Sequence, residues 1–224
     1  GEYLHNRFEP ALFKSMHEKN IEAIPYVNVE DNPSDGWTAF YESPRYSSGY
    51  AALFQTMSFM SETHMLKPFK DRVLSTYAFL QSTIETASLH AKDIITKRQE
   101  SIRQVQQQKT FATGWRPDST KFDLINFSGY AAATKTSDVT GSSRMYYDHT
   151  KPYTKQIKFY NAYQPVATIQ KPAAYIIPHG WQQVIHLLKI NGVQIKQIQK
   201  DTTMQLEYYQ IENYKNSSHP FEKH

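Results

Sequence analysis

The stretch YSSGYAALFQTMSFMSETHM, residues 46–65, decides how the first half of this chain is expected to fold. Within it, the apolar run at residues 53–60 predicts a buried central strand. The acid Glu62 follows that run, and Pro68 precedes a long amphipathic pattern that predicts a helix. Open α/β sheets place their chemistry at such strand ends. An acid there is also typical of an ordinary loop or a helix cap, so the pattern alone leaves both interpretations open.

Two further elements are predicted before this run. Residues 2–20 have the spacing of an amphipathic helix, which Pro10 should kink or split. The β-branched run IEAIPYVNV, residues 21–29, predicts a strand near a sheet edge, because Pro25 has no N–H to donate. The long connection at residues 31–50 is rich in aromatic side chains, which indicates that it is ordered and has a function.

After Pro68, apolar side chains recur at alternating steps of four and three residues over residues 73–94. This spacing predicts a helix with one apolar face, which would continue for a total of about forty residues. Such a helix is longer than one small sheet needs, so its second half is expected to bridge towards another domain. The sequence therefore predicts two domains, residues 1–108 and residues 109–224.

In the second half, short β-branched and aromatic runs alternate with turn signals. Strands are expected at residues 122–127, 155–160, 173–177, 193–195 and 204–209, with a surface turn at residues 136–143. A short helix is expected around residues 184–188, before a turn at Asn191 and Gly192. The predicted fold class is α/β plus mainly β. An α/β half with a long helix would be followed by a small antiparallel β domain that carries one short helix.

Composition narrows the functional classes. The chain has 224 residues, a formal charge of +4 and no cysteine, which excludes disulfides and thiol chemistry. Its basic residues are spread along the chain without a block, so a nucleic-acid partner is not expected. It has no run of 18 apolar residues, so no membrane span is expected.

Three segments of the first half resemble a known family. They are DNPSDGW at residues 31–37, SPRYSSGYAALF at residues 43–54 and SETHMLKPF at residues 61–69. Together they resemble the last part of the catalytic domain of a zinc metallocarboxypeptidase, in a secreted bacterial branch of the carboxypeptidase A-like family. The resemblance implies a carboxypeptidase-like α/β half. The second half resembles the β module that follows the catalytic domain in these enzymes.

The resemblance also implies roles for three residues. Glu62 matches the glutamate that acts as general base beside the zinc-bound water. Arg45 and Tyr46 lie in the loop that carries the substrate-binding arginine and tyrosine of the family, although Tyr41 and Tyr50 lie in the same loop and the spacing does not single out one tyrosine. An arginine that stabilises a loop between aromatic residues is the alternative interpretation. The implied substrate is a peptide, and the implied location is secreted or periplasmic.

The zinc ligands of this family are not expected in this chain. The family uses an H-x-x-E pair and a later histidine, all upstream of the glutamate, to form a His₂Glu site. His219 and Glu222 have the H-x-x-E spacing but lie in the C-terminal tail, and His90 with Asp93 lies on a solvated helix face. We therefore interpret the chain as a fragment. Zinc is expected in the full-length parent, while this chain alone is expected to have no cofactor and no activity.

A non-catalytic glycan- or protein-binding module is the alternative function. Trp115, Trp181 and the pair Tyr146 and Tyr147 would form its stacking platform, although such residues more commonly fill the core of a small β domain. With the upstream strands missing, the strand at residues 53–60 is expected to leave an apolar sheet edge. The chain would form a homo-oligomer through that edge.

Overall fold

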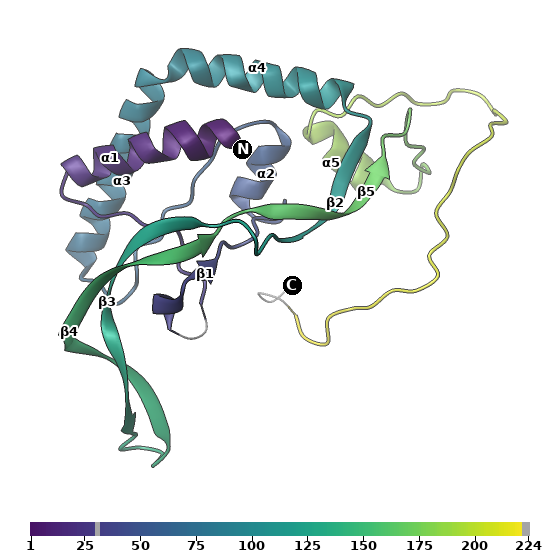
Figure 1. The fold of residues 1–224 in the computed structure, drawn as a ribbon. Coiled ribbons are helices and arrows are strands. Elements are labelled where there is room, and N and C mark those ends of the chain that lie inside the picture. The colour runs from purple at the N-terminus through teal and green to yellow at the C-terminus, as the bar shows by residue number, and fades with distance from the viewer. Residues whose placement is uncertain (30–31, 221–224) are drawn as a thin grey trace. The chain divides into compact units, whose positions relative to one another are not determined.

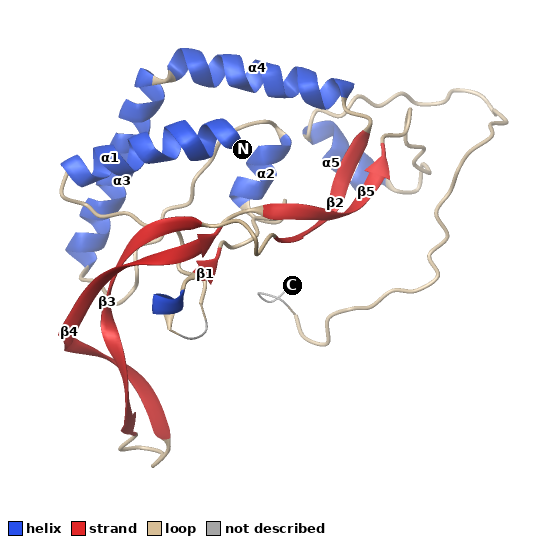
Figure 2. Cartoon of the chain, in the orientation of Figure 1, coloured by secondary structure: helices blue, strands red, loops and turns tan. Residues whose placement is uncertain are grey.

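The computed structural model describes residues 1–29 and 32–220 (Figure 1). Contacts divide the chain into two compact units, Gly1–Lys171 and Pro172–His224. The predicted boundary between residues 108 and 109 falls inside the first unit. Helices and small sheets occur together in that unit, so the chain has the coarse α+β class (Figure 2). None of the described helices is both long and apolar enough to cross a membrane.

The elements are, in chain order, η1 (Leu4–Phe8), α1 (Glu9–Glu18), η2 (Pro33–Asp35), β1 (Trp37–Thr38), α2 (Ser47–Leu53), α3 (Phe69–Leu89), α4 (Ala91–Gln107), β2 (Thr110–Pro117), β3 (Asp123–Thr136), β4 (Ser143–Tyr160), β5 (Tyr163–Gln170) and α5 (Gln182–Ile190).

The first predicted helix forms. Residues 2–18 are helical throughout, with one π-helical turn, η1, directly before α1. Pro10 does not split the helix, and the irregular π-helical turn lies just before it, as is typical of a helix that accommodates a proline. Phe8, Leu12 and Met16 are buried on one face, which confirms the predicted apolar side.

The two strands predicted in the first half do not form. α2 ends at Leu53, and residues 56–64 lie outside helices and strands, as do residues 21–29. Among the described residues, no backbone hydrogen bond joins residues 22–29 or 57–63 to a neighbouring strand. A strand needs a ladder partner, and an apolar β-branched run without one stays irregular. The prediction of a strand at residues 53–60 was therefore wrong here, and so was that of an apolar sheet edge.

The two segments nevertheless alternate their side chains as strands do. Ile21, Ala23, Met57 and Phe59 pack against the buried face of α1. Of the opposite phase, Ile24, Tyr26 and Met60 are exposed, whereas the hydroxyl oxygen of Ser58 is buried. The ring of Phe59 stacks on Phe8 with centroids 5.5 Å apart and meets Phe79 of α3 edge-on at 6.5 Å. Each segment thus has one apolar face covered by helices and one open to solvent.

The predicted forty-residue helix is interrupted at one residue. α3 ends at Leu89, the backbone of His90 leaves the helical region, and α4 begins at Ala91. The hydroxyl of Tyr3 lies 3.2 Å from His90 Nδ1, and the ring of Phe8 meets the imidazole edge-on at 6.4 Å. The interruption therefore coincides with the contact between the junction and the N-terminal helix.

The fully buried side chains of α3 are small: Ala78, Ser82 and Thr86, on a helix that packs against α1. Of the predicted apolar stripe, Ala87 and Ile94 pack against the core around α1. Its large members earlier in α3 are exposed to solvent: Val73, Tyr77, Leu80 and Ile84, the last at 70%. An exposed apolar stripe of this length is typical of a surface that another part of a protein covers.

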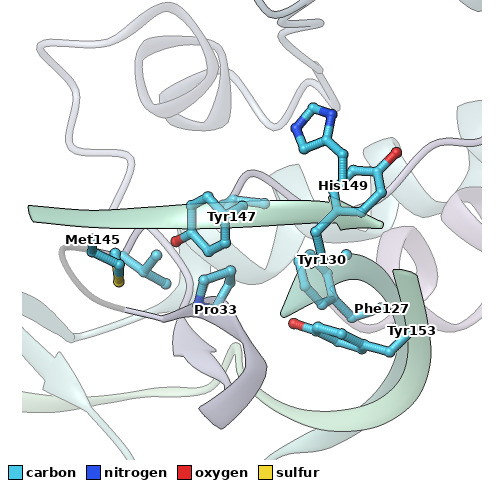
Figure 3. Close-up of a pocket in the computed structure, with 10 residues that line it drawn as sticks. Pro33, Phe127, Tyr130, Met145, Tyr147, His149 and Tyr153 are labelled. Carbon is cyan, nitrogen blue, oxygen red and sulfur yellow. The ribbon is translucent and has the colours of Figure 1, made fainter. Parts of the chain in front are cut away.

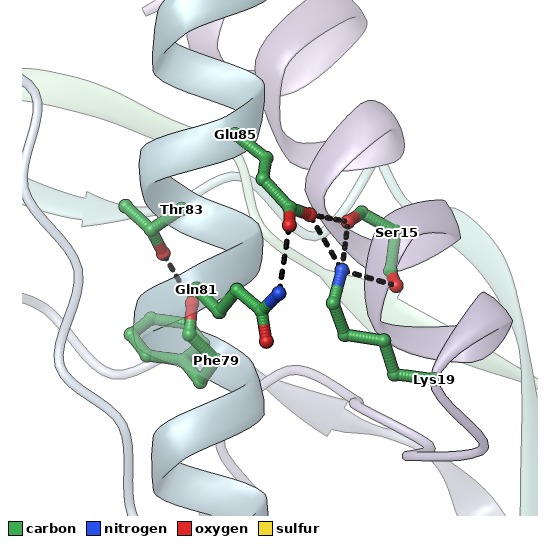
Figure 4. A network of polar contacts seen from close by, with 6 residues as sticks. All are labelled: Ser15, Lys19, Phe79, Gln81, Thr83 and Glu85. Atoms are coloured by element: carbon green, nitrogen blue, oxygen red, sulfur yellow. Dashed lines mark hydrogen bonds and ion pairs between the residues drawn. The ribbon is translucent and has the colours of Figure 1, made fainter.

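A polar network links α1 to α3 (Figure 4). Oε2 of Glu85 accepts hydrogen bonds from Lys19 Nζ at 2.6 Å and from Ser15 Oγ at 3.3 Å. Oε1 accepts from Gln81 Nε2 at 2.9 Å. These hydrogen bonds, first from Lys19 and then from Gln81, lower the pKa of Glu85. Both carboxylate oxygens are used, so the network helps to fix how the two helices align.

The second half of the first unit forms two small sheets. β3 and β4 pair antiparallel as a long hairpin, and the short β1 adds to β4 in parallel. β2 and β5 form a separate two-stranded antiparallel sheet. The predicted strands at residues 122–127 and 155–160 are confirmed as parts of β3 and β4. The predicted turn between them is confirmed too, since β3 ends at Thr136 and β4 begins at Ser143.

A small aromatic core holds β1 against the hairpin. Trp37 of β1 is buried with Phe127, Ile157 and Phe159. Its indole ring meets Phe127 edge-on at 5.6 Å, and its Nε1–H donates to the backbone oxygen of Tyr26 at 2.9 Å. The segment that follows residue 21 is therefore attached to this core as well as to α1.

The second unit contains α5, which confirms the short helix predicted there. The turn at Asn191 and Gly192 is also confirmed, with a φ of +76° at the glycine. The strands expected at residues 173–177, 193–195 and 204–209 are absent, because these runs have no ladder partner in the described chain. The described strands after residue 109 all lie in the first unit, so no antiparallel β domain spans residues 109–224 in this structure.

A second polar network joins the N-terminal helix to β3. Nε2 of His5 lies 3.1 Å from Oδ2 of Asp123, and its Nδ1 lies 3.5 Å from Oε2 of Glu9. Asn161 donates to the same oxygen of Asp123 at 2.6 Å. Burial raises the pKa of Glu9, while the nearby His5 opposes the effect and the charge of Asp123 adds to it. Ionisation of Glu9 therefore opposes folding.

The packing of Phe59 predicts an asymmetry between neighbouring residues. Phe59→Ala should lower the free energy of unfolding by about 1–3 kcal/mol, because it removes a ring that contacts both α1 and α3. Met60→Ala, at a side chain that is 54% exposed, should change it by less than about 0.5 kcal/mol. Urea unfolding followed by circular dichroism measures both, and equal losses would contradict the alternation.

The raised pKa of Glu9 predicts the direction of a pH effect. Its folded-state pKa lies above the unfolded value, so the stability that the neutral acid contributes is complete below about pH 4.3 and is lost as the pH rises through the folded-state pKa. Glu9→Gln should therefore be more stable than the parent protein at pH 7 and similar to it at about pH 3.5. Urea unfolding at the two pH values tests this, with Glu18→Gln on the same helix as control. A difference that grows towards low pH would contradict the prediction.

Candidate functional site

Glu62 lies on an exposed segment between α2 and α3. The segment follows Phe59, whose ring contacts two helices, and it ends where α3 begins at Phe69. His64 lies two residues further on, and its Nδ1 accepts a hydrogen bond from the backbone N–H of Leu66 at 3.2 Å. The imidazole is therefore engaged within its own loop. The carboxylate of Glu62 is accessible to a ligand.

Arg45 and Tyr46 lie at the start of α2. Tyr46 occupies the N-cap position, and its ring meets Phe40 edge-on with centroids 5.0 Å apart. Gly49, in the first turns of α2, is buried against the backbone carbonyl of Ser43, and a Cβ at this position would clash with that oxygen. The glycine therefore allows the preceding loop to pack directly onto the helix. Arg45 and Tyr46 lie between Ser43 and Gly49, in the part of the chain that this contact holds against the helix.

The structure places Arg45 and Tyr46 side by side in one loop and Glu62 on the next segment of the chain, after α2. Within residues 1–29 and 32–220, no group of three or more His, Asp or Glu side chains is arranged to hold a metal ion. His90 contacts Tyr3, as described above. Glu222, the second residue of the H-x-x-E pattern, lies outside the described residues.

The aromatic residues of the alternative function are distributed over three elements. Trp115 lies on β2, and Trp181 caps α5 in the second unit. Tyr146 and Tyr147 are neighbours on β4, so they point to opposite faces of the hairpin. The Nζ of Lys135 lies 5.3 Å from the ring centre of Tyr146, whereas Tyr147 lines a cavity.

This cavity, which we call the hairpin cavity, lies beside β3 and β4 (Figure 3). Its volume of about 410 Å³ is in the range of ligand-binding pockets. One wall is aliphatic and comes from the segment before β1: Val27, Val29 and Pro33. The opposite wall comes from the hairpin and is mainly aromatic: Phe127, Tyr130, Tyr147, His149 and Tyr153.

An irregularity in the hairpin shapes the cavity. Tyr130 of β3 pairs with Pro152 of β4, but the next residue, Ala131, pairs with Asp148. Residues 149–151 of β4 therefore have no partner on β3. Bulges of this kind re-aim side chains and bend the strand. The ring of His149 consequently stacks on Tyr130, with centroids 4.4 Å apart and planes 14° from parallel.

Asp148 holds the bulge in place. Its Oδ1 accepts from the backbone N–H of Thr150 at 3.0 Å and from its hydroxyl at 2.7 Å, and Lys151 Nζ lies 3.5 Å from Oδ2. The hydrogen bonds from Thr150 lower the pKa of Asp148. The same D-x-T-K pattern at residues 118–121 makes the equivalent contacts just before β3. The D-x-T-K pattern thus stabilises a local change of backbone direction through hydrogen bonds between neighbouring residues.

Gly129 provides the floor of the cavity. It pairs with Tyr153 across the hairpin, and the tyrosine ring lies over it. A Cβ at this position would stand 2.8 Å from Cε1 of Phe127 and 3.1 Å from the hydroxyl oxygen of Tyr153. The missing side chain therefore leaves room for both rings.

Sequence reasoning found one residue of this cavity, Tyr147, and missed the others. Two signals were available. Met145, Tyr147 and His149 alternate along one strand and so share one face, and the D-x-T-K pattern occurs twice in the chain. The stacking of His149 on Tyr130 was not predictable, because it depends on the register of the bulge.

Comparisons with known proteins give no further evidence on function. No protein-family model, no curated protein and no solved structure matches this chain.

The described residues predict weak zinc binding by the chain alone. Tight binding needs three or four converging ligands, so dialysis against metal-free buffer should leave much less than one zinc ion per chain. Elemental analysis after loading with one equivalent of zinc measures the retained metal. Retention of one zinc ion per chain through dialysis against a chelator would contradict this prediction.

Proposed function

We propose that this chain is part of a zinc metallocarboxypeptidase and that Glu62 is the general base of the whole enzyme. The observation that carries the proposal is the run SETHMLKPF at residues 61–69, in which an exposed glutamate stands between a packed apolar segment and the start of α3. The enzyme would be secreted or periplasmic, and its substrate would be a peptide with a free C-terminus.

The packing of the two irregular segments supports this proposal. Ile21, Ala23, Met57 and Phe59 use one face of each segment against α1, as strands of a sheet covered by helices would. Three side chains of the opposite phase, Ile24, Tyr26 and Met60, are large and exposed, which suits a surface that further chain covers. Strands from the rest of the enzyme would complete the ladder and cover that second face.

The exposed stripe of α3 supports it as well. The large apolar side chains of Val73, Leu80 and Ile84 are exposed to water. Burying them would stabilise the protein by roughly 25 cal/mol per Å² of apolar surface removed from water. A catalytic domain that continues beyond this chain would bury them. The helix would then have its small side chains against α1 and its large side chains against the remaining domain.

In the complete enzyme the three residues have separate roles. A zinc ion held by ligands outside this chain would lower the pKa of its bound water and polarise the scissile carbonyl. Glu62 would supply the carboxylate that takes a proton from the attacking water and passes it to the leaving amine. Arg45 binds the terminal carboxylate of the substrate through paired hydrogen bonds. Tyr46, next to it in the same loop, contacts the bound peptide.

The test uses the whole protein that contains this chain. Glu62→Gln should lower kcat by about 10²–10⁴-fold without changing the zinc content, because the amide keeps the shape of the side chain but cannot accept the proton. Glu22→Gln, at an exposed acid that contacts His17, serves as the matched control and should leave kcat unchanged. Near-normal turnover of the Glu62 variant would remove this residue from the mechanism.

Arg45→Ala separates substrate binding from a structural role. If Arg45 binds the terminal carboxylate, the variant should raise KM for peptides with a free C-terminus and leave the binding of amidated peptides unchanged. An equal effect on both peptides, with a lowered melting temperature, would assign Arg45 to the packing of its loop.

A further inference from the structure

We propose that the hairpin cavity binds the aromatic side chain of an extended peptide. The inference goes beyond the proposed function and does not rest on it, because the residues that line the cavity include none of the three assigned to the peptidase reaction. The cavity lies on β3, β4 and the segment before β1, whereas those three residues lie beside α2.

The chemistry of the lining selects a neutral, apolar ligand. Its walls combine an aliphatic side, with Val27 and Val29, and an aromatic side, with Phe127 and Tyr147. No carboxylate, guanidinium, ammonium or amide side chain belongs to the described lining. A charged ligand would lose hydration against these described side chains without gaining an ionic partner from them. An aromatic ring gains both burial and edge-to-face contacts.

A few polar atoms remain available for a peptide backbone. The hydroxyls of Tyr130, Tyr147 and Tyr153 and the ring nitrogens of His149 have no hydrogen-bond partner among the described residues. An apolar pocket with a small number of polar groups is typical of a site that fixes the orientation of its ligand. Amide and carbonyl groups on either side of a bound ring are suitable partners for these atoms.

The position of β3 favours a peptide over a small molecule. In the described sheet the strand order is β1-β4-β3, so one edge of β3 has no neighbour. An unpaired edge can accept an extended peptide through backbone hydrogen bonds, while a pocket beside it selects one side chain. Gly129, which forms the floor of the cavity, lies on this same strand.

A sugar ring fits the lining less well. Each pyranose carries several hydroxyls, and each hydroxyl that is buried without a partner costs free energy. The aliphatic wall of Val27, Val29 and Pro33 offers such hydroxyls no side-chain partner. The glycan alternative is therefore an outcome of the test and not the proposal.

The experiment titrates the labelled chain with three probes and follows backbone NMR shifts. The first is a blocked pentapeptide with phenylalanine at its centre and threonines on both sides, and the second has alanine at the centre. The third is methyl β-D-glucopyranoside. Only the phenylalanine peptide should shift the resonances of the cavity, and it should bind at least about fivefold more tightly than the alanine peptide.

Neighbouring residues on β4 provide a matched pair of variants. Tyr147→Ala, at a side chain that is 39% exposed, should weaken binding of the phenylalanine peptide at least about fivefold. Tyr146→Ala, on the opposite face, should leave binding unchanged. Should Tyr147→Ala fail to fold, Met145→Glu keeps the test decisive, because it places a charge in the lining and should also abolish binding.

Four outcomes would overturn the proposal. One is equal affinity for the phenylalanine and alanine peptides, and another is an equal loss from Tyr146→Ala and Tyr147→Ala. The third is tighter binding of the glucoside with shifts at the same residues, which would assign the cavity to a sugar. Absence of any shift at millimolar peptide would also contradict it.

Discussion

The contact of one aromatic ring, that of Phe59, with two helices organises the helical part of this protein. It stacks on Phe8 and meets Phe79 edge-on, so it joins α1 to α3 through a segment that has no secondary structure of its own. A ring buried at such a position contributes by apolar burial and by the geometry of its aromatic contacts. The surface network around Glu85 then adds alignment to a contact that is mainly apolar.

The helices and turns of this chain could be predicted from local patterns. The apolar face of α1, the start of α3 after Pro68, the helix α5 and the glycine turn after it all depend on residues close together in sequence. The break at His90 was not predictable from that pattern, because the apolar spacing continues through it. Its position coincides with a contact to Tyr3, which lies far away in the sequence.

Strands were harder to predict, for a physical reason. β-branched and aromatic composition indicates a residue that suits a pleated surface, but a strand exists only where a partner supplies hydrogen bonds. Residues 122–127 have such a partner in β4, whereas residues 53–60 and 204–209 have none in the described chain. The residues assigned to the peptidase reaction were chosen by resemblance, and the structure describes their positions in two neighbouring segments. The hairpin cavity depends on the pairing register of β3 and β4, which amino-acid composition does not determine.

In the proposed binding site, the three unpaired residues at 149–151 separate recognition from folding. The ladder is regular on both sides of them, so a shorter strand without them would join the same partners in the same order. The hairpin would persist, while His149 and its stack on Tyr130 would be lost. A binding surface of this kind can be acquired or discarded by a single short insertion or deletion, without an intermediate that fails to fold. The rest of the lining is less free to change, because Phe127 lines the cavity and also belongs to the aromatic core around Trp37.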